Sequence, residues 1–255
     1  GRDYLNPNIE LIVDDIIEKN HSQKLLEFLE SWLKNKINIT LKSLIDLKNL
    51  KEKNSSMKAL AYQLYENNGV LKRDQVSEYL KKLGQNERKI LRDLGVKFGR
   101  YHVFLHRLIK PDAVSLRTLL WKNYNQKNFT LKPPTFGLNF LDSNKVKDKN
   151  FMLLCGFEKF ENFFIRIDIL ERLFVQIINS SSEKEKQVKM MPEMLNLLGC
   201  NKENFKKLLK SMNYIVLEKN DETYFKYKPK KIFKKTDKKV EKENPFGVLK
   251  NLNFN

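Results

Sequence analysis

The sequence has few cysteines, no long apolar run and fewer acidic than basic residues, and each shortage excludes a class of protein. Cys155 and Cys200 are the two cysteines, and neither belongs to a CxxC pair. This argues against a disulfide scaffold, so we expect two buried free thiols in a reducing setting. No run of about 18 apolar residues occurs, so we expect no membrane-spanning helix and no membrane partner. The charged opening GRDYLNPNIE is unlike a secretory signal peptide, and we expect a cytoplasmic protein.

Motifs of the common nucleotide-binding and hydrolytic enzymes are also missing. The sequence contains no GxxxxGK[ST], GxGxxG, HExxH or GxSxG pattern, which removes the usual phosphate cradles, the zinc-binding histidine pair and the nucleophilic serine. His102, His106 and the two cysteines are four possible zinc ligands, but their spacing matches no zinc motif. We therefore expect no catalytic residue, no metal site and no cofactor in this chain.

Positive charge is what the sequence has in excess. The chain holds 49 Lys and Arg residues against 31 Asp and Glu, a formal net charge of +18. The first 50 residues are nearly balanced, with 7 basic and 8 acidic residues, whereas residues 51–150 carry 21 basic and 9 acidic ones. Such a field attracts polyanions, with nucleic acid as the first candidate and an acidic protein surface behind it. An AT-rich genome would also raise the lysine count, without any role in binding.

Helical periodicity dominates the first ninety residues. Helices are predicted from about residues 22, 55, 74 and 86, and the last three of them end near glycines. In the first helix we expect one apolar stripe of six residues: Leu25, Leu26, Phe28, Leu29, Trp32 and Leu33. The pattern predicts a helical bundle over residues 1–128.

The stretch LGVKFGRYHVFLHRLIKPDAVSLRTLLW, residues 94–121, joins a strand to a helix. Its first half is rich in Val, Phe and Tyr, which favours a strand with a bulge at Gly99, and Pro111 favours a helix start. The aromatics and cations of this joint form either a buried core with ion pairs or a path for single-stranded nucleic acid. The candidate binding residues are Lys97, Arg100, Tyr101, His102, Arg107 and Lys110.

The second half of the chain has the element order of a winged helix. Residues 129–150 contain two prolines, a glycine and a charged run, which is typical of a linker. Residues 151–229 then show a strand-like run, three helices and a β-hairpin, which predicts a winged helix-turn-helix. The third helix, capped by Asn201, carries four candidates for phosphate contact: Lys202, Lys206, Lys207 and Lys210. We expect a mainly α fold with small β elements (α+β), a helical bundle followed by a winged-helix-like unit.

Residues 230–255 form a basic tail with an apolar end. Lysine dominates the first part, which predicts disorder until an anionic partner binds. The final run PFGVLKNLNF regains apolar residues, so we expect it to dock on the body or on a partner.

Five segments resemble, in the same order, the C-terminal region of the alphaproteobacterial helicases related to the mitochondrial degradosome RNA helicase, a DExH branch of superfamily two. The segments are MKALAYQLYENNGVLKRDQV, LRDLGVKFGRYHVFLHRLIKPDAVSLRTLLW, FIRIDILERL, MLNLLGCNKENFKKLLKSMNY and NPFGVLKNL. The match runs from about Trp32 to the end of the chain. His106 stands where an apolar residue or proline is expected, which argues against a role for its imidazole.

The resemblance implies a parent enzyme, an ATP-dependent helicase and hydrolase, with two upstream RecA-like motor domains that use ATP and magnesium to move on RNA. This chain is similar only to the accessory part, so no catalytic residue transfers to it. The implied role is non-catalytic binding and guidance of single-stranded RNA, with the motor domains as partners. Two other classes stay open: a standalone winged-helix DNA-binding regulator, and a docking module that recruits a nuclease or another protein.

Overall fold

The computed structural model describes residues 4–12, 19–51, 54–125, 131–142, 148–180, 187–219 and 221–228. It confirms the predicted fold class, because most of the described residues are helical and the described strands form small antiparallel sheets of three strands each. The predicted basic tail, residues 230–255, lies outside the described residues.

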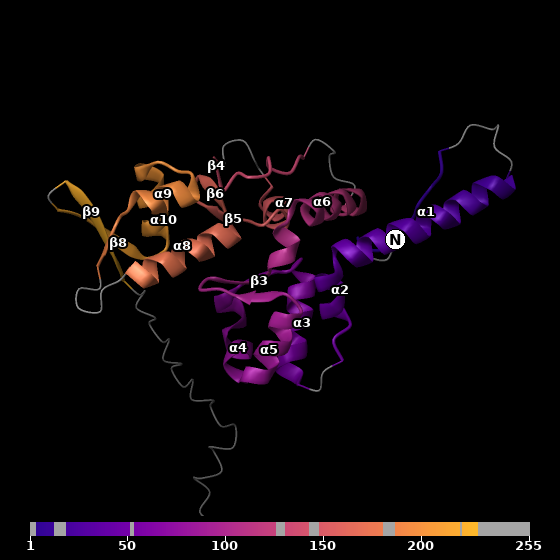
Figure 1. Ribbon diagram of the computed structural model, residues 1–255, viewed down its shortest axis with the longest axis horizontal. Coiled ribbons are helices and arrows are strands. Elements are labelled where there is room, and N and C mark those ends of the chain that lie inside the picture. Colours follow the sequence, from indigo (N-terminus) through magenta and orange to yellow (C-terminus); the bar gives the residue numbers. More distant parts are fainter. Residues whose placement is uncertain are drawn as a thin grey trace, which may run out of the picture.

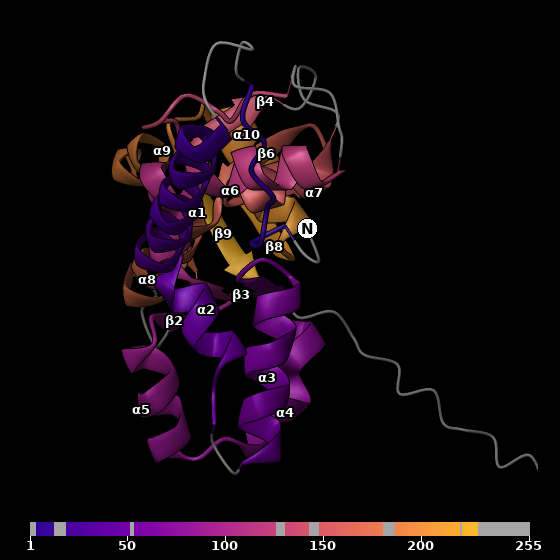
Figure 2. The ribbon, with the colours of Figure 1, turned by 90° about the vertical axis from the view of Figure 1, so that its right-hand side faces the viewer.

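Residues 19–105 form two N-terminal helices and a first compact unit. The two helices are α1 (Lys19–Thr40) and α2 (Lys42–Lys48). Unit 1 then comprises α3 (Ser55–Glu66), β1 (Val70–Lys72), the 3-10 helix η1 (Arg73–Val76), α4 (Ser77–Lys82), α5 (Gln85–Asp93), β2 (Val96–Phe98) and β3 (His102–Leu105). Figure 2 shows α3, α4 and α5 grouped on one side of the strands β2 and β3. The predicted helices are present, and the segment predicted as a helical bundle also contains a three-stranded sheet.

Residues 106–166 form unit 2, which the sequence pattern did not separate. Its elements are η2 (His106–Ile109), α6 (Pro111–Asn125), β4 (Phe140–Asp142), α7 (Lys149–Leu154), β5 (Phe157–Phe160) and β6 (Phe163–Arg166). The stretch predicted as a linker, 129–150, supplies β4, which pairs with β6 in the register Phe140 to Ile165. A strand of three residues between prolines and charges carries too few alternating positions to be recognised in the sequence.

Residues 167–228 form unit 3, which has the predicted order of three helices and a hairpin. Its elements are α8 (Ile167–Ser180), β7 (Val188–Lys189), α9 (Pro192–Leu198), α10 (Lys202–Ser211), β8 (Tyr214–Lys219) and β9 (Glu222–Tyr227). The Asn201 side chain accepts the Asn204 N–H at 2.8 Å to cap α10, as predicted, and Gly199 ends α9 at φ 70°. The predicted strand before α8 is β6, and it belongs to the sheet of unit 2.

The three units repeat one topology along the chain. In each unit a helix precedes the first strand, one or two further helices follow it, and a hairpin closes the sheet. In each sheet the third strand lies between the first and the second. The helix before the second strand also ends alike in each unit, at a residue with positive φ: Gly95 (94°), Gly156 (84°) and Asn213 (65°). This is the connectivity of a winged helix, so the described chain is a tandem of three winged-helix-like units. Unit 2 differs from the others in having a single helix, α7, between its first two strands.

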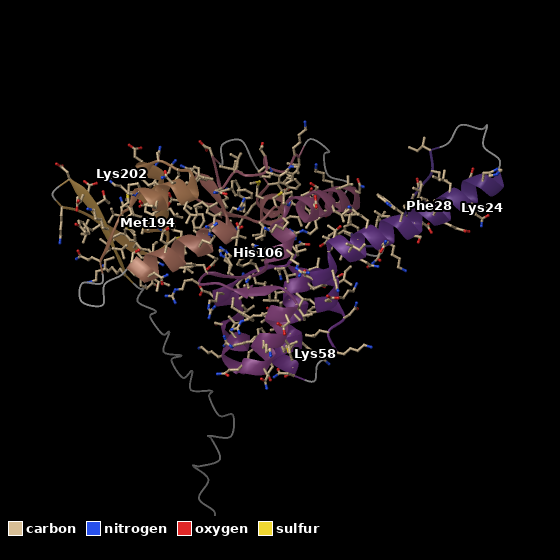
Figure 3. All side chains as sticks on the ribbon, in the orientation of Figure 1. Lys24, Phe28, Lys58, His106, Met194 and Lys202 are labelled. Atoms are coloured by element: carbon tan, nitrogen blue, oxygen red, sulfur yellow. The ribbon has the colours of Figure 1, made fainter. Side chains whose placement is uncertain are left out.

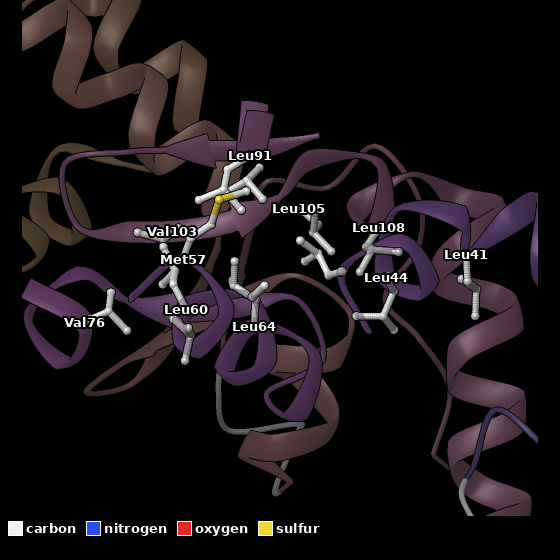
Figure 4. Packing of buried hydrophobic residues seen from close by; sticks show 14 of the residues in the cluster. Leu41, Leu44, Met57, Leu60, Leu64, Val76, Leu91, Val103, Leu105 and Leu108 are labelled. Carbon is white, nitrogen blue, oxygen red and sulfur yellow. The ribbon is translucent and has the colours of Figure 1, made fainter. Parts of the chain in front are cut away.

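Each unit has its own apolar core, and small clusters join the units. Figure 4 shows the core of unit 1, where Met57, Leu60 and Leu64 of α3 meet Leu91 of α5 beneath the sheet. Phe205 and Phe225 belong to the core of unit 3. A further cluster of Val70, Phe104 and Ile167 lies between the first sheet and the start of α8. The first sheet therefore has helices of its own unit on one side and α8 of unit 3 close to the other, as Figure 1 shows.

Candidate nucleic-acid interface

The joint between residues 94 and 105 is a hairpin, and the prediction of one strand with a bulge at Gly99 is wrong. Strands β2 and β3 pair antiparallel, and the Gly99 N–H donates to the His102 carbonyl at 2.8 Å. Arg100 and Tyr101 therefore stand at the tip of a tight turn. A Cβ on Gly99 would meet the carboxylate of Glu171 at closer than contact distance, so any side chain here would have to displace that carboxylate.

The Glu171 carboxylate of α8 fills the concave side of this turn. Its Oε1 accepts the backbone N–H groups of Tyr101 at 2.9 Å and His102 at 2.8 Å. Its Oε2 accepts the N–H of Arg100. Successive N–H groups that converge in this way form a nest, a backbone site for anions. Here the anion is part of the chain itself, so the nest fixes unit 3 against the hairpin of unit 1.

A charged cluster continues from the nest into all three units, with three of its four members buried and Lys72 exposed. His102 Nδ1 lies 3.2 Å from Glu171 Oε1, and its Nε2 lies 3.6 Å from Glu158 Oε2. Lys72 Nζ lies 2.7 Å from Glu158 Oε1. Lys72 and His102 belong to unit 1, Glu158 to unit 2 and Glu171 to unit 3. We call these four residues the inter-unit clasp.

The pKa values within the clasp follow from its contacts. Burial alone lowers the pKa of His102, but Glu158 and Glu171 together raise it above its ordinary value of 6.5. Burial alone raises the pKa of Glu158, but His102 and Lys72 together lower it below its ordinary value of 4.5. Opposite charges at short range thus outweigh desolvation for both groups.

A basic cleft of about 1400 Å³ opens beside the clasp, between the hairpin and η2 on one wall and α8 and α9 on the other. His106, labelled in Figure 3 near the middle of the molecule, belongs to its lining. The cleft exceeds the roughly 300–1,000 Å³ of ordinary small-molecule sites, so its size suits a polymer segment better than a metabolite. Its lining includes three carboxylates, Asp168, Glu171 and Glu193, and six cationic side chains: Arg73, Lys97, Arg100, Lys110, Arg166 and Arg172.

Two of the six cationic side chains are engaged in contacts within the protein. Arg73 Nη1 donates to the Gly99 carbonyl at 2.6 Å, and Arg166 pairs with Asp168, with 2.7 Å between Nε and Oδ1. Within the part of the chain that the structure describes, the other four make no side-chain hydrogen bond or ion pair: Lys97, Arg100, Lys110 and Arg172. These four cations, which we call the open cations, are all exposed, and they come from both walls of the cleft.

The acidic groups of the cleft do not neutralise these open cations. Asp168 is paired with Arg166 and Glu171 is held in the nest, which leaves one carboxylate, Glu193, against the four open cations. His106 is kept neutral near pH 7, because burial and the nearby charges of Lys110 and Lys97 lower its pKa. The cleft therefore presents a positive field to solvent.

The structure brings three of the predicted joint residues together and separates the others. Lys97, Arg100 and Lys110 line the cleft, whereas Arg107 is exposed on η2 outside its lining. His102 is 3% exposed, so the structure removes it from the binding surface.

Tyr101 likewise faces the core of unit 3. Its ring centroid lies 4.1 Å from that of Phe174, and burial raises its pKa above the ordinary value of 10.0. The alternating pattern of a single strand could not predict the burial of Tyr101, because the chain reverses direction at Arg100 and Tyr101.

The lysines predicted on the third winged-helix helix lie apart from the cleft. Lys202, Lys207 and Lys210 are exposed on α10, and Lys206 pairs with Glu218 of β8. That ion pair lowers the pKa of the Glu218 carboxyl. In Figure 3 Lys202 lies well away from His106. The two predicted groups of cations are therefore two separate surfaces.

Sequence reasoning did not single out Arg117, Arg172 or the clasp residues Lys72, Glu158 and Glu171. Arg172 completes the far wall of the cleft. Arg117 is fully buried, and it donates at 2.7 Å to three carbonyls, those of Asn68, Leu108 and Leu154. All three carbonyls lie at or beyond the C-terminal end of a helix, where a cation is favourable. The sequence signal for the burial of Arg117 was its spacing from Ala113 and Leu120, which places it on the apolar face of α6.

The two cysteine thiols are not activated in the described structure. Burial raises the pKa of the Cys155 thiol to about 12 and that of Cys200 to about 11, so neither is a ready nucleophile near neutral pH. Both cysteines are free, Cys155 buried and Cys200 partly buried. Among the described residues no group of three His, Cys, Asp or Glu side chains is placed to hold a metal ion. None of the described helices is both long and apolar enough to cross a membrane.

Comparison of the chain with protein-family models, curated proteins and solved structures finds no match.

Proposed function

We propose that this chain binds single-stranded nucleic acid, RNA in the first place, along the basic cleft, and guides the strand without catalysing a reaction on it. The observation that carries the proposal is the set of open cations, which face one cleft from two walls. A strand lying between the walls would place phosphates within reach of both. Phosphate contacts give affinity without sequence specificity, which suits guidance rather than reading of bases.

Base stacking has a small part in this proposal. Phe98, Phe104 and Phe174 line the cleft. Phe104 and Phe174 are 4% and 1% exposed. The partly buried Phe98 ring has the guanidinium groups of Arg88 and Arg92 at 5.9 Å from its centroid. Single-strand binders that rely on aromatic platforms gain about 1–3 kcal/mol for each stacked base. Without such platforms, binding should be weak at physiological salt and should depend mainly on charge.

The accessory role in an ATP-dependent helicase is supported by the resemblance of the five sequence segments. ATP and magnesium would be bound by the motor domains of such an enzyme, and hydrolysis would take place there. The cleft suits a single strand that such a motor delivers, because its walls come from two units fixed to one another by the clasp. A parent gene that encodes a P-loop and a DExH motif would support this part of the proposal, and a gene without them would contradict it.

The test compares charge reversal inside and outside the cleft. Binding of a labelled oligouridine is measured by fluorescence anisotropy at several salt concentrations, for the unmodified chain and for Arg100→Glu and Lys110→Glu. Lys207→Glu is the matched control, because it changes the same charge on α10. Each cation that contacts a phosphate contributes about 0.7 to the slope of log K against log salt, so each cleft variant should weaken binding and flatten that slope. Equal losses from all three variants would show that net charge, and not the cleft, attracts the RNA.

A second candidate function is duplex DNA binding by α10, favoured by its three exposed lysines. In a winged helix the last helix before the hairpin is the one that enters the major groove. The same assay with duplex DNA separates the two functions. If duplex DNA binds more tightly than oligouridine and Lys207→Glu removes most of that affinity, the α10 surface is the site and the proposal for the cleft is wrong.

A further inference from the structure

Helix α1 carries a wide apolar stripe, and the rest of the described chain covers only one half of it. Leu26, Leu29 and Leu33 are partly buried and Ile37 is 5% exposed, so these residues make the inner face. The segment around Leu5 to Ile9 borders Leu33 and Ile37 on this inner side. The six residues predicted as one apolar stripe do lie within about 160° of one another at 100° per residue, but only half of that stripe is covered: Leu26, Leu29 and Leu33 are partly buried, whereas Leu25, Phe28 and Trp32 are exposed.

The other face, which we call the outer face, carries large apolar side chains in the open. Leu25 is 41% exposed, Phe28 65%, Trp32 56% and Ile39 69%. At 100° per residue all four lie within one sector of the helix. Figure 1 shows α1 extending away from the three units, and Figure 3 labels Phe28 along this projecting part. A contiguous apolar patch of this kind on a charged protein marks an interaction site.

The charges around the outer face have one sign. Lys24 and Lys36 flank the stripe on its two sides, and both are exposed. The acidic residues of α1, Glu27 and Glu30, lie toward the opposite half of the helix by the same helical spacing. The outer face is thus an apolar stripe with basic edges and no carboxylate.

We propose that the outer face of α1 docks an amphipathic helix of another protein, one with an apolar stripe and acidic flanks. Helix-on-helix docking uses apolar anchors at positions such as i, i+3 and i+7, which is the spacing of Leu25, Phe28 and Trp32. The basic edges select acidic flanks, since like charges across such a contact are unfavourable. This surface is separate from the basic cleft, and the inference holds whether or not the cleft binds RNA.

Two other occupants fit the outer face less well. A second copy of this chain would bring the same basic edges together, and each chain carries a net charge of +18. Single-stranded nucleic acid would meet the aliphatic residues Leu25 and Ile39 at the ends of the stripe, where no base can stack on a ring. An acidic amphipathic helix satisfies both the apolar stripe and its edges.

The test uses Trp32 as the reporter. Trp121 packs against Phe151, with 5.9 Å between ring centroids, so Trp121→Phe is a conservative change that leaves Trp32 as the single tryptophan. The probes are two stapled peptide helices with the same leucine stripe, one flanked by glutamates and the other by lysines. Binding is followed by the blue shift of Trp32 emission and, independently, by anisotropy of a label on the peptide. Circular dichroism confirms that each variant keeps its helix content.

The glutamate peptide should shift Trp32 emission to the blue and bind about tenfold or more tightly than the lysine peptide. The double variant Lys24→Glu with Lys36→Glu should reverse that preference, and Phe28→Ala should weaken both peptides. The control Glu27→Lys, on the other half of the helix, should leave the preference unchanged. Equal affinity for the two peptides, or no binding of either, overturns the proposal. A blue shift that appears with protein concentration or with oligouridine instead assigns the face to a second copy or to RNA, and likewise overturns it.

Discussion

Replacing Glu171 by Gln should loosen the contact between unit 1 and unit 3. The carboxylate accepts three backbone N–H groups from the turn and lies 3.2 Å from His102 Nδ1. A glutamine has one oxygen and one NH2 group in the same space. Its oxygen can take the place of Oε1, but its NH2 group then faces the Arg100 N–H, and two donors cannot bond to each other.

The loss can be estimated from these contacts. A hydrogen bond to a charged group contributes about 1.5–3 kcal/mol, and a buried donor left without a partner costs about 1–3 kcal/mol. The bonds that survive change from charged to neutral acceptors and weaken as well. The free energy of unfolding of Glu171→Gln should therefore fall by about 3–5 kcal/mol, measured by urea denaturation followed by circular dichroism.

Glu193→Gln is the matched control for this change. Glu193 also lines the cleft, but it is exposed and makes no hydrogen bond or ion pair to the described residues. Its replacement should change the unfolding free energy by less than about 0.5 kcal/mol. Both substitutions remove one negative charge from the cleft, so Glu193→Gln should tighten oligouridine binding, whereas Glu171→Gln should weaken it because the walls lose their spacing. If Glu171→Gln costs less than about 1 kcal/mol, the reasoning on the nest is refuted.

Three further predictions follow from the same contacts. Because the pKa of His102 is raised in the folded state, its stabilising contribution is complete below about pH 6.5 and is lost as the pH rises through the folded-state pKa. The urea midpoint of the unmodified chain should therefore fall between pH 6 and pH 8.5, and His102→Gln should largely abolish that fall. If the fall persists in His102→Gln, the pKa assignment is contradicted. Arg117→Met leaves three carbonyls inside the protein without their donor and should lower the unfolding free energy by about 3–5 kcal/mol. Arg117→Lys should have an intermediate effect. A loss under about 1 kcal/mol for Arg117→Met would show that water replaces the guanidinium. Gly95→Ala should lower the free energy of unfolding by about 1–2 kcal/mol in thermal unfolding. The cost is backbone strain at φ 94° and not a clash, because the nearest atom to the new Cβ lies 3.7 Å away. Asn213→Gly should be nearly neutral, and equal effects of the two changes would argue against a shared left-handed junction.

The fold class and most of the helices could be predicted because their signals are local. Apolar spacing, the cap at Asn201 and the glycine at 199 act within one or two turns of the chain, and the structure shows α10 and the end of α9 where those signals place them. Strands of three or four residues gave a weaker signal. The repeat of three units stayed hidden for this reason, since β1, β4 and β7 are recognisable only through their pairing with distant partners.

In the candidate site, too, some features follow from the sequence alone and others depend on tertiary packing. The excess of positive charge, the lysines of α10 and the cations at positions 97, 100 and 110 are properties of the sequence itself. Tertiary structure decided which of them share a surface, because Glu171 comes 71 residues after Arg100 and yet fixes the turn that aims it. It also decided that His102 and Arg117 hold units together and that Trp32 and Phe28 face solvent. Sequence determines composition and local periodicity, whereas the side of a helix or turn that is buried depends on which remote segment packs against it.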